Sequence, residues 1–269
     1  QALPPAPQST SGSTTRKLAR DFPHLGLVGY RNINELTRAE HQLHGCETLF
    51  GDFSARVMVL LQNFANVPIV QARMERGERN PFHHSIEAQT NVNLVRLFAP
   101  YFNVNIQGGE CARSCGLYYA NAVWLLKEDP KGQGKSASLP RLRQVLRECD
   151  PVFRATLRNL SNLELIIAFG SVAFKALQMY LNISEDWHGM VTSRRVLSVG
   201  EYLVGATTHS TARGVMRRKH MSPNETDPMA GDIQALWRLS ASSTVTSGLV
   251  STDQAWEHIC TRRWTNRCR

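Results

Sequence analysis

The chain has 269 residues, 42% of them hydrophobic, which is enough to bury one large core or two small ones. Its formal net charge of +9 favours an anionic partner, with nucleic acid ahead of a membrane surface because no basic amphipathic helix is evident. No apolar run approaches the ~20 residues of a membrane span and no secretory leader opens the chain, so we expect no membrane association.

The first third of the chain is predicted to contain little regular structure before one buried strand. Residues 1–17 are rich in Pro, Ser, Thr and Gln, a composition typical of disorder. Residues 33–43 have the apolar spacing of a short helix. Residues 55–61 (ARVMVLL) form a continuous apolar run of strand length, which predicts a buried parallel strand that ends at the polar pair Gln62 and Asn63.

The middle of the chain is predicted to alternate between helices and strands. We expect a charged loop at residues 68–80, a helix at 85–98 capped by Ser85, and a second buried strand at 116–126 that contains one polar residue, Asn121. Two helices should follow at 139–148 and 151–160.

The last third repeats the same alternation. The sequence predicts strands at 163–169, 195–199 and 202–207, a helix at 172–181, and helices at 232–239 and 252–263. Strands that alternate with helices favour a three-layer α/β/α sandwich with a central, mostly parallel sheet. We assign this domain to residues 18–240 and interpret residues 241–269 as a basic C-terminal extension, helical and packed on the domain.

Several polar residues fall where predicted strands end. In open α/β sheets, ligands bind outside the carboxyl ends of the strands. That rule groups Asn63, Asn121, the Gly170-Ser171 turn and His209. Taken singly, Asn121 is equally well explained as a hydrogen-bonded structural amide. The turn, taken singly, is better explained as a tight turn without a ligand than as a phosphate cradle at a helix N-terminus.

The segment 204–220 (VGATTHSTARGVMRRKH) combines a histidine, small hydroxyl residues and a cluster of cations. Such a combination at a strand end suits a phosphate-bearing substrate whose reaction develops negative charge. The plainer alternative is a surface histidine beside a solvated basic loop.

Six cysteines in a chain of this length do not suggest a disulfide scaffold. We therefore expect an intracellular protein, cytoplasmic in a prokaryote or a virus-infected cell, or nuclear in a eukaryote. Cys111 and Cys115 are too few for a zinc site, which needs three or four ligands.

Five segments resemble, in order, the motifs of the uracil-DNA glycosylase superfamily. Residues 51–65 (GDFSARVMVLLQNFA) resemble its first strand and water-activating loop, with LQNFA where relatives carry Gly-Gln-Asp-Pro-Tyr or Gly-X-Asn-Pro-Gly. Residues 80–82 (NPF) resemble the segment whose Phe stacks on the flipped base, and residues 119–123 (YANAV) the strand whose Asn reads the uracil edge. Residues 163–177 resemble the third strand and its helix, and residues 209–213 (HSTAR) match the His-Pro-Ser-Pro-Arg or -Leu catalytic and wedge loop.

This resemblance spans about residues 46–219 and points to a divergent member, closest in motif pattern to the single-strand-selective and iron–sulfur-type branches. It implies a monofunctional hydrolase of base-excision repair that flips out uracil and cleaves its N-glycosidic bond, leaving an abasic site. In the family pattern His209 stabilises the departing uracil anion and Asn63 positions the attacking water. Asn121 pairs with the uracil edge, Phe82 stacks on the base, and Gln62 contacts it.

The resemblance also implies how the rest of the substrate is bound. Ala65 stands where some relatives carry a bulky Tyr against C5, so we expect 5-substituted uracils to be accepted as well. The residues expected to contact DNA, single- or double-stranded, are Ser171, Ser210, Arg213, Arg217, Arg218 and Lys219, with Arg213 filling the gap left by the flipped base. The protein would act as a monomer without a cofactor or metal; only Cys46 precedes the first strand, where the iron–sulfur branches need paired cysteines.

The sequence departs from the family pattern at three loop positions. Leu61 replaces a Gly, Phe64 replaces a Pro, and Ser210 replaces the Pro that follows the histidine. Asn63 cannot ionise, so turnover should be slower than in relatives with Asp. These departures favour the alternative, a catalytically weak or inactive protein that binds nucleic acid or recognises damage with the same fold.

Overall fold

A computed structural model describes residues 26–32, 55–63, 66–76, 88–101, 106–107, 110–111, 117–128 and 141–243 of the chain. The segments predicted to be disordered at 1–17 and helical at 33–43 and 252–263 lie outside these residues. Of the extension predicted at 241–269, only the first three residues are described, and they end a helix of the domain.

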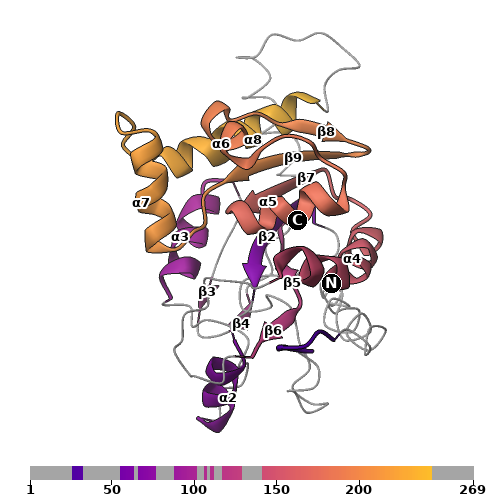
Figure 1. Cartoon of the computed structure of the whole chain (residues 1–269). Helices are drawn as coiled ribbons and strands as arrows, with labels where there is room; N and C mark the ends of the chain where they lie inside the picture. The colour runs from indigo at the N-terminus through magenta and orange to yellow at the C-terminus, as the bar shows by residue number, and fades with distance from the viewer. Residues whose placement is uncertain are drawn as a thin grey trace, which may run out of the picture.

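A central sheet of five strands organises the described part of the chain (Figure 1). Its order is β5 (Leu117–Val123), β2 (Val57–Asn63), β7 (Leu165–Phe169), β9 (Tyr202–Thr207) and β8 (Leu197–Val199). The first four strands are parallel, and β8 pairs with β9 in the antiparallel sense at the edge. The prediction of an α/β fold with a mostly parallel sheet is confirmed.

Helices cover both faces of this sheet. One face packs against α4 (Leu142–Asn159) and α5 (Ser171–Tyr180), and the other against α3 (Gln89–Phe98) and α8 (Pro228–Ser243). Because side chains alternate along a strand, β2 sends Met58 and Leu60 to the first face and Val57, Val59 and Leu61 to the second. Both sets are buried, which explains the unbroken apolar run in the sequence.

The remaining elements surround this three-layer core. They are α2 (Val67–Glu75), α6 (Trp187–Ser193), α7 (Ala212–Met221) and two small antiparallel sheets, β1 (Tyr30–Asn32) with β6 (Leu125–Lys127) and β3 (Ile106–Gln107) with β4 (Glu110–Cys111). No helix among the described residues is long and apolar enough to cross a membrane.

Predictions for two parts of the chain were wrong because local cues were misjudged. The predicted loop at 68–80 begins with α2, whose first turn is capped by Asn66: its side-chain oxygen accepts the Ile69 N–H at 3.2 Å. The two helices predicted on either side of Pro151 form one helix, α4. Buried residues in both halves, among them Leu146 and Phe153, face the same core, and this packing outweighs the local cost of the proline.

The basic segment after His209 was also interpreted differently from what the structure shows. Residues 212–221, where no helix was predicted, form α7, with Thr211 as its N-cap. The helix predicted at 85–98 begins only at Gln89, and the predicted cap Ser85 lies outside the described residues. The strands predicted at 163–169 and 202–207 are confirmed within two residues.

Candidate functional site at the carboxyl ends of the strands

His209 leaves the sheet two residues after the end of β9 and is half-buried. Its Nδ1 accepts a hydrogen bond from the backbone N–H of Thr211 at 3.2 Å. An acceptor nitrogen carries no proton, so this bond places the proton of the neutral imidazole on Nε2. The neutral ring is therefore set up to donate a hydrogen bond from Nε2.

Gly170, at the end of the neighbouring strand β7, lies against His209. Its N–H donates to the carbonyl of Thr207 at 2.9 Å, and its φ of 97° is a conformation that other residues rarely adopt. A Cβ at this position would lie 3.3 Å from the Cβ of His209. Glycine therefore lets β7 end directly beside the histidine.

The first turn of α7 holds the other side of the His209 loop, the residues 208–211 that join β9 to α7. Thr211 caps the helix, its hydroxyl accepting the N–H of Gly214 at 3.3 Å. A Cβ on Gly214 would lie 2.7 Å from the carbonyl carbon of His209 and would overlap the carbonyl oxygen. The backbone of His209 is thus in direct contact with the backbone of α7.

Helix α3 contributes a third contact to the same loop. The side-chain amide of Asn93 donates to the carbonyl of Ser210 at 2.6 Å, and its oxygen accepts from Gln89 at 3.0 Å. Figure 1 shows α3 and α7 beside each other at the end toward which β9 runs. Residues of α3 and α7, together with Gly170 directly after β7, contact the backbone around His209 and hold it in position.

The two asparagines predicted for the site lie in adjacent strands. Asn121 of β5 pairs in register with Leu61 of β2, two residues before Asn63 at the end of that strand. By alternation Asn121 follows Tyr119 on the face covered by α3 and α8. Asn121 is 4% exposed, and its side-chain oxygen has no hydrogen-bond partner among the described residues. A buried acceptor without a partner is costly and therefore noteworthy.

The structure brings these residues to one edge of the sheet. Gln62 and Asn63 are half-buried at the end of β2, next to β5, and β7 separates β2 from β9. His209 therefore leaves the sheet two strands from Asn63, roughly 10 Å along the sheet at the usual strand spacing. Ala65 and Phe82 lie outside the described residues.

An ion-pair network centred on the buried Asp232, which the sequence did not reveal, lies directly behind this edge. The carboxylate of Asp232 on α8 accepts from the Thr207 hydroxyl at 2.6 Å, from Arg218 Nε and Nη2 at 2.7 Å each, and from Arg194 Nε at 2.9 Å. Arg194 also pairs with Glu225, and this hydrogen bond and charge lower the pKa of the Glu225 carboxyl.

Two residues that were predicted to contact DNA are buried in the structure. Arg218 is 1% exposed and pairs with Asp232 inside the protein, so it does not belong to the basic surface. The side chain of Ser210 is fully buried as well. The sequence offered no sign that one of the four cations at positions 213–219 points inward. Once residues 212–221 are recognised as a helix, Gly214 and Arg218 lie one turn apart on its buried face.

The other predicted DNA contacts are exposed. Arg213, Arg217 and Lys219 lie on α7, and Ser171 begins α5, whose N-cap Gly170 makes no side-chain capping bond. The guanidinium of Arg217 stacks 4.7 Å from the ring centroid of Trp187, whose Nε1–H donates to the carbonyl of Thr207 at 3.3 Å. Met216, which is 60% exposed, lies between Arg213 and Arg217 in the sequence of α7.

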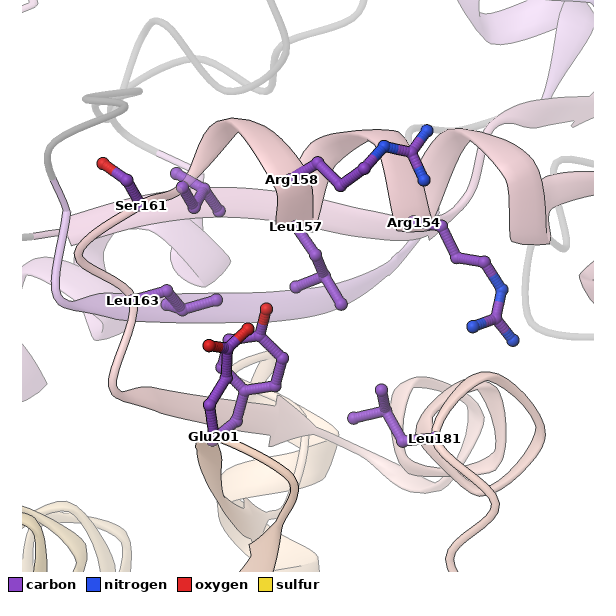
Figure 2. A pocket seen from close by; sticks show the side chains of 9 residues that line it. Arg154, Leu157, Arg158, Ser161, Leu163, Leu181 and Glu201 are labelled. Atoms are coloured by element: carbon purple, nitrogen blue, oxygen red, sulfur yellow. The ribbon is translucent and has the colours of Figure 1, made fainter.

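A cavity of about 390 Å³ lies at the opposite end of the sheet, between the second half of α4 and the starts of β7 and β9 (Figure 2). Arg154, Arg158, Glu201, Leu163 and Leu181 are among its lining residues, and none of the predicted site residues lines it. Burial, together with the hydrogen bond and charge of Glu201, raises the pKa of the lining residue Tyr202 to about 12. In the part of the chain that the structure describes, no group of three metal-ligating side chains is arranged to hold an ion.

Comparison with known proteins adds no family assignment. The sequence matches no protein-family model and no curated protein. The case for a function therefore rests on the arrangement at the strand ends.

Proposed function

We propose that the protein is a DNA glycosylase that flips out uracil and hydrolyses its N-glycosidic bond. The observation that carries the proposal is the hydrogen bond from the Thr211 N–H to Nδ1 of His209, which places the proton of the neutral ring on Nε2. Glycosidic cleavage sends the bonding electrons into the base, and a neutral donor aimed at the resulting anion stabilises it without prior proton transfer. The site would act on DNA in the nucleus, or in the cytoplasm of a prokaryote or a virus-infected cell.

The proposed reaction uses two residues at the strand ends. The bond from C1′ to N1 of uracil breaks, the sugar gains oxocarbenium character, and His209 Nε2–H donates to O2 of the uracil anion. A water oriented by Asn63 adds its oxygen to C1′ and loses one proton to solvent, while the uracil anion takes up a proton and leaves. Because an amide does not ionise, Asn63 orients the water but does not act as a strong base.

Base recognition is assigned to Asn121. A carboxamide pairs with uracil by accepting from N3–H and donating to O4, and the Asn121 oxygen is a buried acceptor with no partner among the described residues. Cytosine presents an acceptor and an amine at the same positions, which would leave the buried amide mismatched and cost several kcal/mol. We propose that Ala65 leaves space for 5-substituted uracils at the far edge of the base.

DNA binding is assigned to the exposed face of α7. Arg213 and Arg217 are exposed there one helical turn apart, and the exposed Lys219 follows on the same helix, where its Nζ donates to the carbonyl of Glu225. Phosphate contacts from such cations supply most of the sequence-independent affinity. Arg213 lies nearest to His209 in the chain and would fill the gap that the flipped base leaves. Arg217 is held in place by its contact with the Trp187 ring.

A second candidate is a protein that binds damaged or unpaired bases without cleaving them. The observation that favours it is the residue at the end of β2, Asn63, whose amide cannot ionise and therefore cannot act as a strong base. Such a protein would use the same donor at His209 and the same acceptor at Asn121 for recognition alone.

Oligonucleotides with one uracil distinguish the two functions. Single- and double-stranded substrates are incubated with protein in EDTA, treated with alkali, and examined for strand cleavage at the uracil. A cytosine-containing strand and a His209→Gln variant serve as controls. We expect uracil-dependent cleavage that EDTA does not abolish and that the variant loses. Folded wild-type protein that binds these strands but cleaves neither would favour the second candidate.

A further inference from the structure

We propose that Asp232 is a positioning residue that holds both ends of the His209 loop through one buried carboxylate. The loop, residues 208–211, joins β9 to α7. Asp232 lies on α8, more than 20 residues further along the chain, and accepts hydrogen bonds from Thr207, Arg218 and Arg194, all of which lie outside the loop. The effect of Asp232 on catalysis rests on the proposed function, whereas its effect on the position of His209 rests on its hydrogen bonds with Thr207 and Arg218.

The first end of the loop is held through Thr207, the last residue of β9. Its hydroxyl donates to Asp232 Oδ2 at 2.6 Å, and its carbonyl accepts from Gly170 N–H and from Trp187 Nε1–H. Thr207 is fully buried. Both its side chain and its backbone are therefore fixed two residues before His209.

The second end is held through Arg218. Its Nε and Nη2 donate to the two oxygens of Asp232, a bidentate geometry that fixes both distance and orientation. Arg218 lies one turn after Gly214, whose backbone touches the carbonyl of His209. The carboxylate thus sets α7, and with it the backbone of His209, relative to the end of β9.

The charges of the network are balanced within the protein. Asp232 and Glu225 face Arg194 and Arg218, two negative and two positive side chains. Removing the Asp232 carboxylate would leave Arg218 buried without its partner, a change expected to prevent folding. Thr207→Val is the sharper variant, because it breaks one link between the loop and the carboxylate and leaves both arginines paired.

Amide hydrogen exchange of Thr211 reports directly on the loop, because this N–H donates to Nδ1 of His209. We expect Thr207→Val to accelerate this exchange roughly tenfold or more, the loss expected for one hydrogen bond to a charged group. Thr156→Val in α4 is the matched control: Thr156 is equally buried, and its hydroxyl donates to the carbonyl of Val152 at 2.9 Å. Unchanged exchange at Thr211 in Thr207→Val, or equal acceleration in both variants, overturns the inference.

Kinetics on a single-stranded uracil oligonucleotide test the catalytic part. In Thr207→Val we expect kcat to fall about tenfold with KM nearly unchanged, and Thr207→Ser, which keeps the hydroxyl, to restore it. Faster exchange with an unchanged kcat would overturn the positioning role. A wild-type protein without glycosylase activity would refute the proposed function alone, since the exchange experiment still decides whether Asp232 holds the loop.

Discussion

Gly214 leaves no room for a side chain beside the carbonyl group of His209. A Cβ there would overlap backbone atoms, which cannot move aside as the end of a flexible side chain can. We therefore predict that Gly214→Ala displaces the His209 loop from α7 and destabilises the protein by about 1–3 kcal/mol, the usual cost of overpacking. Thermal unfolding measures the loss, and the uracil assay should show a larger fall in activity than stability alone explains.

Gly231→Ala provides the matched control for this prediction. Gly231 lies in α8, and its Cβ would meet the ends of the Arg194 and Glu225 side chains at 3.0 and 3.1 Å. Those ends can shift, and alanine favours the helix by up to about 1 kcal/mol. A Tm for Gly214→Ala as high as that for Gly231→Ala would show that the loop yields easily, contrary to the prediction.

The parts of the fold that the sequence predicted well are those set by continuous burial. β2 and β7 are buried on both faces, so their apolar runs marked them without any tertiary knowledge. α4 was divided in error because Pro151 is a local signal, whereas the packing that overrides it comes from residues distant in sequence.

The site shows the same contrast between local and long-range information. The rule that ligands bind at the carboxyl ends of parallel strands was sufficient to group Asn63, Asn121 and His209 at one edge. Asp232 could not be predicted, because an aspartate in a helix is usually solvated and its partners Thr207 and Arg218 come from two other elements. Its role depends entirely on tertiary contacts.

Charge reversal on α7 tests the DNA surface. Arg213→Glu combined with Arg217→Glu should weaken DNA binding and make the dependence of log K on log salt shallower by about two phosphate contacts. Arg158→Glu, at an arginine that is also exposed but lies at the other end of the sheet, should leave that slope almost unchanged. Fluorescence anisotropy at several salt concentrations gives the slopes. Equal changes of slope in the α7 double variant and in Arg158→Glu would mean that α7 is not the principal DNA contact.

The Arg194–Glu225 pair predicts a pH dependence of stability. The hydrogen bond and charge of Arg194 lower the pKa of the folded-state Glu225 carboxyl below the ordinary value of 4.5. Glu225 therefore contributes stability that is present above pH 4.5 and is lost as the pH falls through the folded-state pKa. Glu225→Gln should therefore lower Tm near neutral pH, and the difference from wild type should shrink below about pH 4.5. Glu75→Gln, at an exposed glutamate ending α2, should show little difference at either pH. A Glu225→Gln difference that grows in acid would contradict this assignment.

Asn121 gives the sharpest separation between a functional and a structural amide. Its buried side-chain oxygen has no partner among the described residues, so Asn121→Leu, which keeps the volume, should leave Tm unchanged or raise it. The same variant should lose roughly 100-fold in kcat/KM on uracil, equivalent to two hydrogen bonds of about 1.4 kcal/mol each.

Asn93→Leu is the matched control, because Asn93 is similarly buried but its amide bonds Ser210 and Gln89. We expect this variant to lower the unfolding free energy by about 1–3 kcal/mol, since it leaves the Ser210 carbonyl without its donor. If Asn121→Leu instead costs as much stability as Asn93→Leu and retains uracil cleavage, then Asn121 is a structural amide of β5. Base recognition would then have to be assigned to another residue at the strand ends.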